Sequence, residues 1–144
     1  MSVTLDVNVL LYASDERSPR HERARSLVET IASGPEITYL FWPTIMGYLR
    51  LATHPAVFEQ PLALSAAIAN VEALLARPHV RAPGEPDDFW KTFRVVTDDA
   101  TPTGNLVPDA HLVALMRAHD VRSIWTADRD YRRFRGIEAV DPFE

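Results

Sequence analysis

The sequence predicts an α/β fold with a mainly parallel sheet of about five strands. Short apolar segments alternate with amphipathic segments along the chain, and 144 residues suffice for one domain with a real core. We therefore expect residues 1–144 to form a single domain. A hydrophobic content of 47% and a mean hydropathy of −0.12 are typical of a soluble globular protein. No apolar run approaches the ~20 residues of a membrane helix, and no signal peptide is evident, so we expect a cytoplasmic location without membrane contact.

Glycine and proline mark the boundaries of the elements in the first half of the chain. Pro19 opens a helix that Gly34 closes, and Pro43 opens another that ends before Pro55. Between them, β-branched residues favour strands. We predict strands at 2–6 and 37–41 and helices at 7–12, 18–33 and 43–53, with Ile45, Met46, Leu49 and Ala52 on the inner side of the last helix.

The second half continues the alternation. An Ala- and Leu-rich helix is followed by a short strand centred on Val80, and a further helix is capped by Asn105 with Pro108 in its first turn. We predict helices at 64–77, 85–99 and 106–119, strands at 121–125 and 138–140, and a short helical segment after Asp128.

Three aspartates are predicted to meet at one edge of the sheet. Asp6 follows the first strand, and Asp128 follows the strand "SIW" by three residues. Asp109 shares the apolar face of its helix with residues at i+3, i+4 and i+7. In parallel sheets, ligand sites lie beyond the carboxyl ends of the strands. Singly, the three aspartates are explained by helix capping, a helix dipole and a turn; together they would repel unless protonated or bound to cations.

Magnesium is the expected cation, because it prefers oxygen ligands at about 2.0 to 2.1 Å and keeps several waters. A magnesium ion held in this way lowers the pKa of a bound water and orients it towards phosphorus, which predicts phosphodiester hydrolysis. Asn8, Asn105 and Asp130 are auxiliary candidates, as is Thr126, which we expect to hydrogen-bond an aspartate. Arg129, Arg132 and Arg133 are candidates for RNA contacts, with a solvated helix face as the alternative explanation.

Other chemistries have less support. The net charge of −5 argues against a broad non-specific grip on nucleic acid, and the absence of cysteine excludes thiolate sites and cysteine nucleophiles. His111 and His119 lack a third ligand at zinc spacing, so we expect surface histidines.

Three segments in order, "TLDVNVLLYA", "NLVPDAHLVALM" and "IWTADRDYRRF", resemble the PIN-domain family, and more narrowly the VapC-type toxins of type II toxin–antitoxin pairs. The resemblance implies an α/β/α sandwich and an endoribonuclease that depends on Mg²⁺ or Mn²⁺. It places Asp6, Asp109 and Asp128 as catalytic metal ligands, with Asp130 at a position that is often acidic. It also implies an RNA substrate (tRNA, rRNA or mRNA), a homodimer, and a cognate antitoxin that wraps the toxin.

One position departs from the family pattern. Gly47 stands where the family usually has a glutamate, and no acid occurs between Phe41 and Phe58. Two alternatives therefore stay open at this point. One is a catalytically weak module that acts by binding RNA or protein. The other is a phosphatase or receiver domain with Asp6 as nucleophile, although "DVNV" lacks the second aspartate that such phosphatases use.

Overall fold

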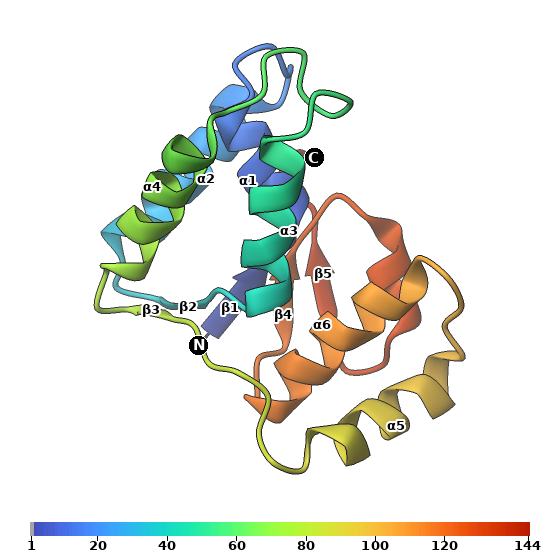
Figure 1. The fold of residues 1–144 in the computed structure, drawn as a ribbon. Helices are drawn as coiled ribbons and strands as arrows, with labels where there is room; N and C mark the ends of the chain where they lie inside the picture. Colours follow the sequence, from blue (N-terminus) through green and yellow to red (C-terminus); the bar gives the residue numbers. More distant parts are fainter. Residues whose placement is uncertain (1) are drawn as a thin grey trace.

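The computed structural model describes residues 2–144, and its five strands form one sheet in which every pairing is parallel (Figure 1). The predicted α/β fold with a parallel sheet is confirmed. The order across the sheet is β3-β2-β1-β4-β5. The strands are β1 (Ser2–Leu5), β2 (Ile37–Tyr39), β3 (Val80–Arg81), β4 (Ser123–Trp125) and β5 (Glu138–Val140).

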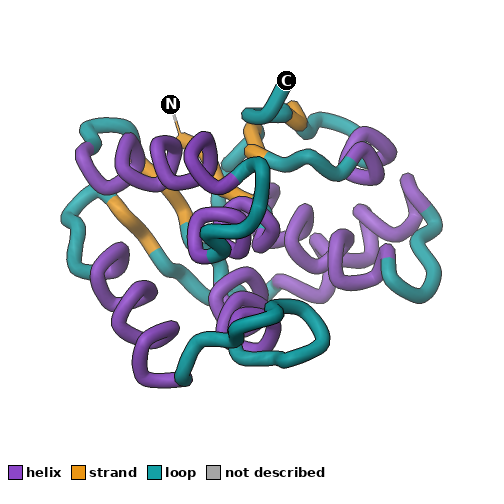
Figure 2. The backbone as a smooth tube through the Cα atoms, turned by 90° about the horizontal axis from the view of Figure 1, so that it is seen from above, coloured by secondary structure: helices purple, strands orange, loops and turns teal. Residues whose placement is uncertain are grey.

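The helices are α1 (Val7–Ser14), α2 (His21–Ser33), α3 (Trp42–Ala52), α4 (Leu64–Leu75), α5 (Phe89–Ala100) and α6 (Leu106–Ala118), with a short 3₁₀ helix η1 (Arg129–Arg133). Helices lie on both sides of the strands, as Figure 2 shows. Among residues 2–144, no helix is both long and apolar enough to cross a bilayer.

The centre of the sheet determines which residues meet at its carboxyl edge. β1 is the middle strand, and Leu5 is paired with Trp125 of β4. The next residues along both strands, Asp6 and Thr126, therefore lie side by side. Backbone hydrogen bonds continue the pairing: the Asp6 amide donates to the carbonyl of Trp125 at 3.0 Å, and the Thr126 amide donates to that of Val140 at 3.0 Å.

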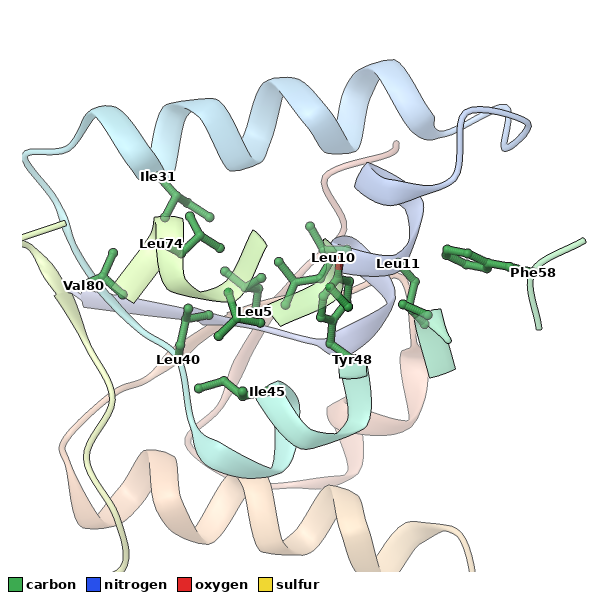
Figure 3. Packing of buried hydrophobic residues seen from close by; sticks show 14 residues of the cluster. Leu5, Leu10, Leu11, Ile31, Leu40, Ile45, Tyr48, Phe58, Leu74 and Val80 are labelled. Atoms are coloured by element: carbon green, nitrogen blue, oxygen red, sulfur yellow. The ribbon is translucent and has the colours of Figure 1, made fainter. Parts of the chain in front are cut away.

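Two hydrophobic clusters hold the helices in place. In the first, α1–α4 pack together with residues from the β1, β2 and β3 side of the sheet, and Figure 3 shows Leu5, Leu40 and Ile45 at its centre. The second joins α5, α6 and η1 around Ile124 of β4. Burial of this apolar surface is the main stabilising term of the fold. The two clusters hold the strands and helices that carry the polar residues at the carboxyl edge of the sheet.

Local differences from the predicted elements have physical explanations. α2 begins at His21 because Ser18 forms a turn, its hydroxyl accepting the Arg20 amide at 3.1 Å. α5 begins at Phe89, since Glu85 lies in the preceding linker and hydrogen-bonds His111. The prediction that Met46 points inward is wrong: its exposed fraction is 53%.

Tyr48 takes the inner position on α3 instead of Met46. It is 2% exposed, and its hydroxyl hydrogen-bonds the Ser14 hydroxyl at 2.8 Å and the Asn70 amide at 2.9 Å. Apolarity alone favoured Met46, whereas Tyr48 can be buried because both partners satisfy its hydroxyl.

Candidate functional site

Asp6 is tolerated inside an apolar segment because both of its carboxylate oxygens are hydrogen-bonded. One oxygen accepts the amide of Val7 at 2.7 Å, capping α1, and the other accepts the hydroxyl of Thr126 at 2.8 Å. The residue is 7% exposed. Burial raises the pKa of the Asp6 carboxyl, the two hydrogen bonds oppose this rise, and the negative charge of Asp128 adds to it.

Thr126 connects the first aspartate to the loop after β4. Its side chain is buried, and its hydroxyl donates to Asp6 while accepting the amide of Asp128 at 2.9 Å. Asp128 in turn accepts the amide of Asp130 at 2.9 Å and caps η1. A continuous set of hydrogen bonds thus fixes the loop that carries Asp128 and Asp130.

Asp109 reaches the same place from the first turn of α6. Its carboxyl is half-buried, and burial is the largest cause that raises its pKa to about 6. A hydrogen bond with the Tyr131 hydroxyl opposes the rise, and the negative charges of Asp128, Asp6 and Asp130 reinforce it. Burial, the negative charges of Asp6, Asp109 and Asp128, and the hydrogen bond to Asp109 raise the pKa of Tyr131 well above its ordinary value, so its hydroxyl stays protonated.

The side chains of Asp109, Asp128 and Asp130 converge. Each offers one carboxylate oxygen, and these three oxygens lie within 4.8 Å of one another. Oxygens that share one Mg²⁺ at 2.0 to 2.1 Å are about 3 to 4 Å apart, so small side-chain rotations would complete such a set. The donors are carboxylates alone, which suits Mg²⁺ or Mn²⁺ better than Zn²⁺. The residues therefore fit a hard divalent cation.

Among the residues that the structure describes, no cationic side chain forms an ion pair with this cluster. Within residues 2–144, none of the ion pairs involves Asp6, Asp109, Asp128 or Asp130. The arrangement differs from the expectation in one respect. Asp130, predicted as auxiliary, is one of the three converging carboxylates. Asp6, a predicted ligand, is not among these three, but its charge acts on Asp109 and its hydrogen bond to Thr126 links it to the Asp128 loop.

The two asparagines predicted as auxiliary site residues, Asn8 and Asn105, are not among the three converging residues. Asn8 is half-buried in the first turn of α1. Asn105 is exposed at the N-terminus of α6, and the prediction that its side chain caps this helix is wrong. Its backbone angles, φ −67° and ψ −12°, are already helical, while capping side chains act from an extended backbone.

The predicted RNA-binding arginines lie on η1, next to the cluster in sequence. Arg132 and Arg133 are exposed, and Arg129 places its guanidinium 3.9 Å from the carboxylate of Glu144. Gly47 lies on α3 close to Val7: a Cβ atom added to it would meet Val7 Cγ2 at 3.6 Å, an ordinary contact. There is room for a Cβ atom at this position, but α3 contributes no acid.

Tyr131 is the site residue that sequence reasoning missed. The stretch "RDYRR", residues 129–133, has one aromatic residue among charged ones, and a lone aromatic in a polar helix is a signal of burial. The two histidines behave as expected, at or near the surface: His111 hydrogen-bonds Glu85 at 2.8 Å, and His119 hydrogen-bonds the carbonyl of Gly84 at 2.9 Å.

An all-parallel sheet with aspartates gathered at its carboxyl edge defines the class of this protein: an α/β protein with an acidic site suited to a hard divalent cation. The PIN domain model matches residues 3–137. The chain is also 52% identical over 143 residues to Ribonuclease VapC48 of Mycobacterium tuberculosis, covering 99% of each chain. It therefore belongs to the PIN-domain family, and within it to the VapC group.

Solved structures agree on the fold. VapC20 of Mycobacterium tuberculosis, described as a sarcin–ricin loop cleaving toxin, superimposes with a TM-score of 0.65 at 17% identity, covering 94% of this chain and 98% of that one. A chain of a toxin–antitoxin complex from Klebsiella pneumoniae gives a TM-score of 0.63 at 16% identity, covering 99% and 98%. At these identities the likeness concerns the fold alone.

Proposed function

We propose that this protein is an endoribonuclease, the toxin of a toxin–antitoxin pair, which hydrolyses RNA phosphodiesters with the help of a divalent metal ion. The observation that carries the proposal is the convergence of the carboxylate oxygens of Asp109, Asp128 and Asp130 within 4.8 Å. The identity of 52% to a VapC ribonuclease supports it. A catalytically weak binding module and an aspartyl-phosphate enzyme are not favoured, because neither accounts for both findings.

Mg²⁺, or Mn²⁺ in its place, is the proposed cofactor, held by Asp109 and Asp128 with Asp130 beside them. When bound, such an ion supplies an activated water and stabilises the charge that develops on the phosphate. Asp6 contributes a fixed negative charge behind the ligands. Thr126 fixes the Asp6 carboxylate relative to the Asp128 loop, because its hydroxyl hydrogen-bonds both.

The remaining side chains orient the ligands and the substrate. The Tyr131 hydroxyl, which stays protonated, holds one orientation of the Asp109 carboxylate. With a pKa of about 6, Asp109 is mostly ionised at neutral pH even before an ion binds. Arg129, Arg132 and Arg133 are proposed to contact the RNA backbone. Water attack on phosphorus predicts products with a 5′ phosphate and a 3′ hydroxyl.

The test is cleavage of a pool of total tRNA and rRNA by metal-stripped protein, with and without Mg²⁺ or Mn²⁺. Asp109→Asn should abolish discrete cuts, while Asp120→Asn, an exposed aspartate on the α6–β4 turn, is the matched control and should cleave like the wild type. Metal-independent cleavage that leaves a 2′,3′-cyclic phosphate would contradict the proposal. Metal binding without any cleavage would instead favour the binding module.

We propose two protein partners, an antitoxin and a second copy of this chain. The acidic cluster has no ion-pair partner among residues 2–144, and it therefore suits an antitoxin that brings a basic side chain. Homodimerisation is supported by Trp42 and Met46, neighbours on α3 that are 40% and 53% exposed. Light scattering of wild-type and Met46→Glu protein tests the dimer. We also propose the cytoplasm as the compartment, since the RNA substrates are there.

A further inference from the structure

The guanidinium of Arg20 lies over two adjoining aromatic rings. Its guanidinium carbon lies 5.3 Å from the centre of the Tyr12 ring on α1 and 5.0 Å from that of Phe143 near the C-terminus. The two rings meet edge to face, with centroids 5.4 Å apart, and the guanidinium donates a hydrogen bond to the Tyr12 hydroxyl at 3.3 Å. We name Tyr12, Arg20 and Phe143 the Arg20 platform.

The charge of Arg20 is fixed but not neutralised. Arg17, three residues earlier, forms an ion pair with Glu59, and Arg25 pairs with Glu29. Among the described residues, Arg20 has no carboxylate partner, and its side chain is exposed. Cation–π contacts use the charge of a guanidinium and not its N–H groups. Most of its five donors therefore stay free for an anion, and a planar guanidinium matches a phosphate in a bidentate contact.

The platform lies at the same edge of the sheet as the aspartates. Phe143 follows the carboxyl end of β5 by three residues, and the C-terminus lies beside α1 in Figure 1. The next residue, Glu144, approaches the guanidinium of Arg129, which directly follows Asp128. Arg23 fixes this segment by donating to the carbonyl of Pro142 at 2.8 Å. Arg20 and Arg129 thus contact neighbouring residues of the C-terminal segment, Phe143 and Glu144.

We propose that Arg20 binds a phosphate of the RNA strand to one side of the cleaved bond, and that Tyr12 and Phe143 position its guanidinium for this contact. The inference rests on the proposed function, because it takes RNA as the ligand. A single strand cut at the carboxylate cluster has to continue across the neighbouring surface, and its flanking phosphates need cations at fixed places. The ordered guanidinium supplies one of them.

The test is RNA binding in a protein that cannot cleave. Fluorescence anisotropy with a labelled single-stranded RNA of about 20 nucleotides is followed over a series of salt concentrations, in EDTA, in the Asp109→Asn background. Adding Arg20→Gln should weaken binding about 3- to 10-fold at low salt and reduce the slope of log K against log salt by about 0.7, the value for one phosphate contact on a single strand. Phe143→Leu, which keeps the charge, should weaken binding by a smaller factor.

Arg17→Gln is the matched control, since it removes the same charge from the same loop but from a residue already paired with Glu59. It should leave the slope unchanged. Equal slopes for Arg20→Gln and Arg17→Gln, or no RNA binding at all, would overturn the inference. Because the readout is binding, the two proposals fail separately. RNA binding that depends on Arg20, together with no cleavage of the RNA pool by the wild-type protein in Mg²⁺ or Mn²⁺, would refute the nuclease but not the platform.

Discussion

Replacing Asp109 by asparagine should make the metal-free protein more stable at neutral pH, although it removes a proposed catalytic group. The pKa of this carboxyl is 3.8 in the unfolded chain and about 6 in the folded one. Because the folded value is higher, the protonated carboxyl stabilises the fold below pH 3.8, and this contribution is lost as the pH rises through 6. Above that pH the ionised carboxylate remains unfavourable relative to a neutral side chain.

The magnitude follows from the pKa difference. A rise from 3.8 to about 6 corresponds to about 3 kcal/mol at 1.36 kcal/mol per pKa unit. Since the Asp109 side chain is only half-buried, solvent screening reduces this to about 1.5 kcal/mol. Asparagine is neutral at every pH and keeps an oxygen that can accept the Tyr131 hydrogen bond. In a chain of this size, about 1.5 kcal/mol raises Tm by roughly 3 to 6 °C.

Thermal unfolding followed by circular dichroism, in EDTA, is the assay. Asp109→Asn should melt roughly 3 to 6 °C above wild type at about pH 7.5, and the difference should shrink below about pH 5, where the wild-type carboxyl is protonated. Millimolar Mg²⁺ should raise the Tm of the wild type and not that of the variant. A variant less stable than wild type at both pH values would refute the argument that burial and the neighbouring aspartates make the ionised Asp109 carboxylate unfavourable in the fold. Asp120→Asn should show no such pH dependence.

Three further predictions concern the surroundings of the cluster. Thr126→Val removes a hydrogen bond to a carboxylate and should cost about 1.5 to 3 kcal/mol in urea unfolding, whereas Thr4→Val, which loses a bond to a neutral carbonyl, should cost about 1 kcal/mol. Gly47→Glu has space for its Cβ atom and gains helix propensity, so the variant should keep wild-type stability. Calorimetry should show that it binds Mg²⁺ about tenfold more tightly, a gain of about 1.4 kcal/mol. Unchanged affinity would mean that the added carboxylate does not reach the ion. Tyr131→Phe removes the hydrogen bond that lowers the pKa of Asp109, so NMR titration of this carboxyl in metal-free protein should give a midpoint above about 6.

The fold could be predicted because local signals agree with the tertiary structure. Gly34, with φ +69°, ends α2 where the sequence places the stop, and β1 and α1 divide at Asp6. The exchange of Met46 for Tyr48 could not be foreseen. Burial of a tyrosine depends on whether partners meet its hydroxyl, and those partners, Ser14 and Asn70, come from other helices.

The candidate site was predictable to the extent that it lies at strand ends. Asp6 and Asp128 follow β1 and β4, and the paired register of these strands brings them together. The contribution of Tyr131 depends on how η1 packs against α6. Tyr131 is 22 residues away from Asp109 in sequence, and the periodicity of residues within one element does not predict a contact between two elements. The convergence of Asp130 likewise depends on the turn that Asp128 forms by accepting its amide.

The structure assigns different tasks to aspartates that look equivalent in sequence. Asp6 is the most constrained, since both of its oxygens accept hydrogen bonds and its backbone amide continues the pairing with β4. Asp109 and Asp128, which are half-buried, bring their oxygens within 4.8 Å of each other and of Asp130 from a helix start and a loop. In the proposed function, the Asp109 and Asp128 carboxylates would close around the ion while Asp6 stays held by its two hydrogen bonds. Substitution of Asp6 should therefore impair both folding and metal binding, whereas substitution of Asp109 should impair metal binding alone.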